Sequence, residues 1–88
     1  MLEDGAIQIE LFRNRAFIRT VLVRVGGVYA VDPPNPQKLK HRGRVCTVLD
    51  FLRDEKLGHA FGARVRFLDN NRRGVVDALH ELVPVQSN

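Results

Sequence analysis

Apolar and polar side chains alternate along several short segments of this sequence. Residues 6–12 place Ile7, Ile9 and Leu11 at every second position, which is the period of a strand with one buried face. Residues 63–68 repeat the pattern, with arginines on the second face. No window of a dozen residues carries a helical apolar stripe free of Gly and Pro. The sequence therefore predicts a mostly β protein.

Turn-forming residues separate several further predicted strands along the chain. Further strands are predicted at 16–25, 28–31, 45–52 and 75–77. The pairs at 14–15 and 26–27 have the composition of two-residue turns, so we expect two linked hairpins within 1–32. Residues 53–62 are expected to form a flexible loop between antiparallel strands. Residues 78–83 precede a proline and are too few for a helix, so they predict one short 3₁₀ turn before a last strand.

Prolines at positions 33, 34 and 36 exclude regular structure in the middle of the chain. We therefore expect a Pro-rich basic loop at 33–44, which separates the N-terminal hairpins of 1–32 from the strands of 45–85. A chain of 88 residues is too short to divide into two cores, so residues 1–88 are predicted to form a single domain.

The expected order from Gly43 onward is strand, variable loop, strand, tight turn, strand, 3₁₀ turn and strand. The residues that carry this order are 42–48, 63–67, 73–77 and 82–84. The pattern resembles small SH3-like β-barrels, including the KOW and Tudor-like modules, mainly over residues 42–84. The resemblance implies a small SH3-like barrel, to which the N-terminal hairpins add an extension.

The charge balance is basic and is dominated by arginine. The chain has 14 Lys and Arg against 10 Asp and Glu, for a net charge of +4, and 11 of the 14 cations are arginines. The planar guanidinium matches phosphate oxygens in a bidentate way, which favours nucleic-acid backbones as partners. A GC-rich genome also raises arginine over lysine without functional meaning, so both explanations stay open.

Basic residues in the loop and in the strands after it form the candidate binding surface. The predicted nucleic-acid-binding residues are Lys38, Lys40, Arg42, Arg44, Arg64, Arg66, Arg72 and Arg73. In a barrel they could line one positive groove that neutralises several phosphates. The alternative is a solvated surface on which some arginines pair with Asp50, Asp69 or Asp77.

Base stacking needs exposed aromatic rings, of which this sequence offers few. Tyr29, beside the second turn, and Phe61, between two glycines, are the candidate stacking residues, although either ring could instead cover the core. The leading hypothesis is a non-enzymatic barrel that binds the phosphate backbone of DNA or RNA. The alternative is a small protein-interaction or inhibitor module, with a homodimer as one form of it. In this alternative the N-terminal hairpin presents an edge strand and the arginines meet an acidic partner.

Motifs for catalysis, metals and cofactors are not found in the sequence. Cys46 and the three histidines stand singly, without metal-ligand spacing, and no Gly-rich phosphate-binding motif occurs. We therefore expect no catalytic residue, no metal and no cofactor. The stretch 16–31 is interrupted by arginines and glycines, which excludes a membrane span there. A single cysteine and an acidic N-terminus without a leader pattern favour the cytoplasm.

Overall fold

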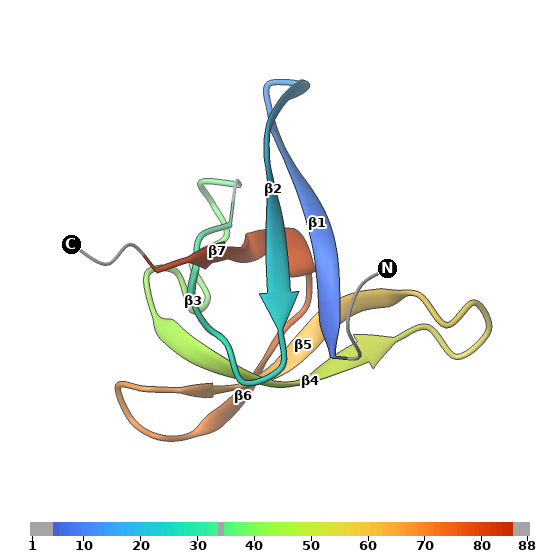
Figure 1. The fold of residues 1–88 in the computed structure, drawn as a ribbon. Helices are drawn as coiled ribbons and strands as arrows, with labels where there is room; N and C mark the ends of the chain where they lie inside the picture. Colours follow the sequence, from blue (N-terminus) through green and yellow to red (C-terminus); the bar gives the residue numbers. More distant parts are fainter. Residues whose placement is uncertain (1–4, 34, 86–88) are drawn as a thin grey trace.

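The computed structural model describes residues 5–33 and 35–85 (Figure 1). The strands are β1 (Ala6–Arg13), β2 (Ala16–Arg24), β3 (Val28–Val31), β4 (Val45–Arg53), β5 (Ala60–Phe67), β6 (Arg73–Val76) and β7 (Leu82–Pro84), and the 3₁₀ helix η1 (Leu79–Glu81) precedes β7. The prediction of a mostly β fold with an N-terminal hairpin and one short 3₁₀ turn is confirmed.

β1 and β2 form a separate two-stranded antiparallel sheet. The turn between them has Asn14 at φ 50° and Arg15 at φ 65°, and two consecutive left-handed residues define the type I′ turn that suits the twist of a two-residue hairpin. The predicted turn at 14–15 is therefore confirmed. The far end of this hairpin projects beyond the rest of the fold (Figure 1).

The second predicted hairpin is wrong, because β2 does not pair with β3. Gly26, at φ +85°, turns the chain from one sheet into the other. Its N–H donates to the carbonyl of Val48 at 2.7 Å, and the Val48 N–H donates to the carbonyl of Gly27 at 3.0 Å. These two hydrogen bonds tie the glycine pair to β4. The glycines therefore form a corner between two layers, while β3 pairs with β4 and β7.

The second sheet has five antiparallel strands in the order β6-β5-β4-β3-β7. β6 and β7 are its two edges, so the sheets do not close into the barrel that the sequence predicted. Closure would require hydrogen bonds between β6 and β7. These strands are linked along the chain through η1 but are not neighbours in the sheet. The β1–β2 hairpin packs over the sheet through the half-buried side chains of Ile7, Ile9 and Leu11.

The core lies between the hairpin and the five-stranded sheet. Its fully buried side chains include Val23 from β2, Val48 from β4, Val65 and Phe67 from β5, and Leu82 from β7. β6 crosses close to the Phe67 ring, and a Cβ atom on Gly74 would collide with that ring. Glycine at position 74 therefore lets β6 approach the core closely. Its neighbours in β6, Arg73 and Val75, point to the opposite face of the sheet.

The connection between β4 and β5 is shorter than the predicted loop of 53–62. β5 already begins at Ala60, which pairs with Arg53, so the connection is reduced to 54–59. The Asp54 carboxylate accepts hydrogen bonds from the backbone N–H groups of Lys56 and Leu57 at 2.8 and 2.9 Å. These bonds lower the pKa of Asp54 and stabilise a turn in place of a flexible loop.

Candidate nucleic-acid interface

β5 separates core side chains from basic side chains, as its alternation predicted. Ala63, Val65 and Phe67 are buried, whereas Arg64 is exposed and Arg66 is half-buried. Successive side chains of a strand point to opposite faces, so the two arginines lie on the face of the sheet that is turned away from the core.

β6 adds a third arginine to the same face. Arg73 of β6 is the direct cross-strand partner of Arg66 of β5, and side chains in this relation lie about 5 Å apart at Cβ. Within the described residues, the side chains of Arg66, Arg72 and Arg73 have no ion pair or hydrogen bond. Like charges directly opposite each other destabilise a sheet. This pair is therefore a concentration of positive charge that nothing in the described chain neutralises.

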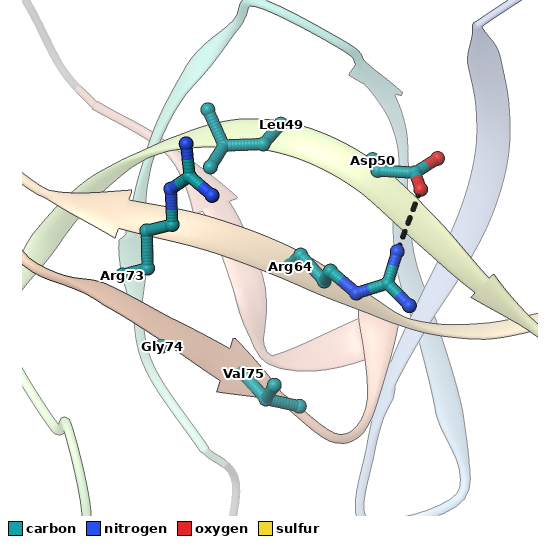
Figure 2. Close-up of a pocket in the computed structure, with 6 residues that line it drawn as sticks. All are labelled: Leu49, Asp50, Arg64, Arg73, Gly74 and Val75. Carbon is teal, nitrogen blue, oxygen red and sulfur yellow. Dashed lines mark hydrogen bonds and ion pairs between the residues drawn. The ribbon is translucent and has the colours of Figure 1, made fainter.

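Arg64 differs from Arg66 because it has an acidic partner. Its Nη1 donates to Oδ2 of Asp50 on β4 at 2.9 Å (Figure 2). The Asp50 Oδ1 also accepts from the N–H of Phe51 at 2.8 Å. Both side chains are more than half exposed, so water screens the pair and its contribution to stability is small.

An open depression lies between these arginines on the outer face of the sheet. It has a volume of about 520 Å³ and is lined by Leu49, Asp50, Arg64, Arg73, Gly74 and Val75. Figure 2 shows the Arg73 guanidinium pointing toward the Leu49 side chain, while the Arg64 guanidinium points toward Asp50. The depression is therefore apolar in the middle and charged at its rim.

Lys38 and Arg42 from the Pro-rich loop face acidic groups of the same chain. The Lys38 Nζ lies 2.7 Å from Oδ1 of Asp77 and also bonds to the buried carboxylate of Glu81. The hydrogen bonds that Lys38 donates to these two carboxylates raise its pKa. Arg42 lies 3.6 Å from Asp32 and donates to the carbonyl of Asn35. These cations hold the loop in place.

Arg44 is held against the core at the base of the loop. Its Nε and Nη2 donate to the two oxygens of Asp69 at 2.9 and 2.8 Å, and its guanidinium lies 3.8 Å from the centre of the Phe67 ring. The bidentate bond lowers the pKa of Asp69. His41 packs on the same ring at 4.5 Å, and burial is the main cause of its lowered pKa. Arg44 is therefore committed to folding contacts.

Lys40 is the exposed cation of the loop that approaches β6. It lines a small cavity of about 90 Å³ together with Lys38 and Val75. Val75 also lines the larger depression on the outer face. Within the described residues Lys40 has no ion pair. The edge strand β6 therefore has Arg73 on its outer face and Lys40 near the same edge.

The structure does not gather the eight predicted cations into one groove. Four of them have acidic partners within the chain: Lys38, Arg42, Arg44 and Arg64. Arg44 also stacks on Phe67 at the core side of the sheet, opposite to the face of Arg64 and Arg66. The other four predicted cations form no ion pair in the described part of the chain and are available to a ligand: Lys40, Arg66, Arg72 and Arg73. Of these, Lys40 lies near enough to Asp77 for its charge to contribute to the lowered pKa of that carboxyl group.

The two candidate stacking residues have different environments. Tyr29 is only 6% exposed, and its hydroxyl donates to the carbonyl of Leu22 at 3.0 Å and accepts from the N–H of Arg24 at 2.8 Å. The stacking role predicted for Tyr29 is therefore wrong, because a buried ring cannot meet a base. Phe61 is exposed on β5, and its stacking role stays a prediction.

The hairpin tip carries an apolar surface that sequence reasoning missed. Phe12 is 53% exposed and Phe17 is 56% exposed, and the two rings meet edge to face at 5.8 Å. Ile18 beside them is exposed as well. The available signal was the pair of apolar residues on each side of the turn, at 11–12 and 17–18, which leaves apolar groups on both faces of the ribbon.

Cys46 belongs to the core, and its thiol has low reactivity. Its side chain is buried, and burial raises the pKa of the thiol to about 11, so the thiolate nucleophile is scarce at neutral pH. In the part of the chain that the structure describes, no group of three His, Cys, Asp or Glu side chains is arranged to hold a metal ion. Among the same residues, no helix has the length and apolar character of a membrane span.

Comparison with known proteins identifies no relative of this chain. No family model, no curated protein and no solved structure matches this chain. The outer surface formed by β4, β5 and β6 is therefore the basis for a functional proposal.

Proposed function

We propose that this protein is a non-enzymatic nucleic-acid-binding module that contacts the phosphate backbone through the outer face of β5 and β6. The observation that carries the proposal is the cross-strand pair of Arg66 and Arg73, which has no acidic partner in the described residues. An anion that bridges the two guanidinium groups would relieve their repulsion. Arg72 and Lys40 extend the surface along the turn and the edge of β6.

The order of elements in the fold supports a scaffold of SH3-like type. The order β4, β5, β6, η1 and β7 is the order of elements on which the likeness to SH3-like modules was based. We propose an SH3-like sheet, open between β6 and β7, as the scaffold. The cytoplasm is the proposed compartment, since the one cysteine of the sequence is buried as a free thiol.

The test is fluorescence anisotropy with a labelled single-stranded oligonucleotide and with a duplex, titrated over a range of salt concentrations. Wild-type protein should bind with an affinity that falls steeply as salt rises. The double variant Arg66→Gln/Arg73→Gln should bind at least about tenfold more weakly at low salt. Its salt slope should be shallower by about 1.4 on single strands, because each lost phosphate contact removes about 0.7.

The matched control removes the same charge elsewhere. Arg15→Gln/Arg19→Gln takes two cations from the exposed hairpin, so its net charge equals that of the sheet variant. It should keep most of the affinity and the salt slope. Equal losses for the two variants would show that only net charge matters, and binding no tighter than that of an unrelated folded protein of the same charge would overturn the proposal.

A second candidate function is supported by the hairpin rather than by the sheet. Phe12, Phe17 and Ile18 expose apolar surface at the end of a projecting ribbon, and such surfaces are typical of protein contacts. In this case the protein is an interaction or inhibitor module, as a homodimer or with an acidic partner. Apolar substitutions at the tip would then dominate the loss of binding, with weaker salt dependence.

A further inference from the structure

We propose that the depression on the outer face of β4, β5 and β6 holds one nucleobase of a single-stranded nucleic acid. This inference rests on the proposed function, because the phosphates beside the base would lie on Arg66, Arg72 and Arg73. It goes beyond backbone binding because it requires an unpaired base and a site of defined chemistry.

The middle of the depression suits the apolar face of a base. Leu49 from β4 and Val75 from β6 supply apolar side chains on opposite sides, and the backbone of Gly74 completes the lining. Val75 is 46% exposed, so a ligand would cover surface that is now in water. The volume of about 520 Å³ lies within the range of small-ligand sites and accommodates a purine or a pyrimidine.

The rim of the depression suits the polar edges and the face of a base. Asp50 and Arg64 lie next to each other in a 2.9 Å ion pair, and the second carboxylate oxygen of Asp50 accepts a hydrogen bond from the Phe51 N–H. A carboxylate accepts hydrogen bonds from amino and imino groups of bases, and a guanidinium donates to their carbonyl and ring nitrogen atoms. Guanidinium planes such as those of Arg64 and Arg73 also stack on bases.

A β-bulge explains why these groups share one site. The pairing of β4 with β5 shifts register between Val48 and Asp50, so that Val48 opposes Val65 while Asp50 opposes Arg64. The residue between them, Leu49, is the extra residue of the bulge, and a bulge redirects side chains near binding sites. It places an apolar group and a carboxylate next to each other, where a regular strand would send them to opposite faces.

Charge complementarity selects a nucleic acid over an uncharged aromatic ligand. Arg73 lines the depression and is also the cross-strand neighbour of Arg66. A base in the depression would therefore have its own phosphate group close to the cations that lack acidic partners in the described chain. A duplex keeps its bases stacked inside, so the site selects single strands.

The test compares a single-stranded oligonucleotide with an abasic strand of the same length and charge, by fluorescence anisotropy with wild-type protein. The base-containing strand should bind about 5- to 140-fold more tightly, which corresponds to the roughly 1–3 kcal/mol of one stacked base. The two strands should give the same salt slope, because their phosphate contacts are the same.

Leu49→Ser and Val75→Ser are the site variants, and Val85→Ser is the matched control. Val85 follows β7 at the other edge of the sheet and is 44% exposed, close to the 46% of Val75. Each site variant should bind the base-containing strand no better than the abasic strand while keeping the salt slope. The control should behave as wild type. Thermal unfolding followed by circular dichroism shows whether each variant is folded. If only one of the two site variants folds, the loss of base preference in that variant is sufficient to test the site.

The outcomes separate this inference from the proposed function. Equal binding of both strands by wild-type protein, with steep salt dependence, would leave backbone binding intact and overturn the base site. A preference for bases that survives both site variants would also overturn it, since the base would then stack elsewhere, with Phe61 as the next residue to substitute. Binding to neither strand would overturn both proposals.

Discussion

The role of Tyr29 depends on its neighbours in space and not on its neighbours in the sequence. Beside two glycines, an aromatic residue is expected near the surface of a turn. In the structure its hydroxyl bonds to the backbone of Leu22 and Arg24, and a Cβ atom on Gly27 would lie 2.7 Å from the same hydroxyl. The glycine therefore makes room for the ring, and the ring closes the corner between the two sheets.

Tyr29→Phe should lower the free energy of unfolding by about 1–2 kcal/mol, because it leaves a backbone N–H and a carbonyl without their partner. Equilibrium unfolding in urea measures this loss. Phe61→Leu changes an exposed aromatic ring and should shift the midpoint much less. Equal stability of Tyr29→Phe and wild type would mean that water replaces the hydroxyl and that the corner is open to solvent.

The β1–β2 hairpin combines two different surfaces along one element. Toward its base, Val21 and Val23 of β2 are buried in the core. Toward its turn, residues 16–20 are all exposed, although this part of β2 has the same β-branched and apolar composition. Sequence alternation predicts which side chains share a face, but the length over which the sheet covers the hairpin depends on the packing of the other elements.

Phe17→Ser should lower the free energy of unfolding by about 1 kcal/mol or less, since it removes an exposed edge-to-face pair with Phe12. Val23→Ala should cost about 2 kcal/mol, because Val23 is fully buried. Unfolding in urea compares them. Similar losses for both variants would mean that the tip packs against the body of the protein.

Sedimentation velocity of wild type and Phe17→Ser then tests the second candidate function as a homodimer. A concentration-dependent dimer in wild type that is lost in Phe17→Ser would assign the tip to self-association. A monomer at all concentrations would remove the homodimer from consideration and leave an acidic protein partner as the remaining form of this candidate.

At the scale of the whole molecule, ion pairs between distant segments hold the Pro-rich loop against the sheet. Lys38 contacts Asp77 and Glu81, and Arg44 contacts Asp69. The three aspartates that the sequence analysis named as potential partners, Asp50, Asp69 and Asp77, all have a basic partner in the structure. The alternative interpretation of the basic residues, as a paired and solvated surface, therefore holds for part of the predicted set.

These pairs make stability sensitive to acid. The hydrogen bond from Arg44 lowers the pKa of Asp69, and the hydrogen bond from Lys38 lowers the pKa of Asp77. A carboxyl group with a lower pKa in the folded state stabilises the protein above its unfolded pKa of about 3.9, and the contribution is lost as the pH falls through the folded pKa. Stability should therefore fall as the pH drops below about 4.

Urea unfolding of wild type and Lys38→Gln/Arg44→Gln between pH 2 and pH 7 measures this effect. The variant should be less stable at pH 7 and should lose less of its stability below pH 4. Added salt should narrow the difference, because both aspartates are more than half exposed. Parallel profiles for the two proteins would show that these pairs do not control the acid response.

Local patterns determined the class of the fold and part of the site. The two-residue period assigned Arg64 and Arg66 to one face of a strand and Val65 and Phe67 to the other, because side-chain direction in a strand follows directly from residue order. Residues 14–15 specified a hairpin turn, because φ and ψ at a two-residue turn are local properties. The 3₁₀ turn before β7 followed from the short interval ahead of Pro84 in the same way.

Tertiary structure alone decided which cations have partners and which strands lie side by side. Lys38 contacts acidic residues about 40 positions away along the chain. At Gly26 the chain forms a corner and not the predicted second hairpin, because the glycine pair hydrogen-bonds to β4. The bulge at Leu49 and the pairing of Arg66 with Arg73 depend on register between strands. The physical reason is that long-range pairing is set by the packing of the whole core, which no local window of sequence contains.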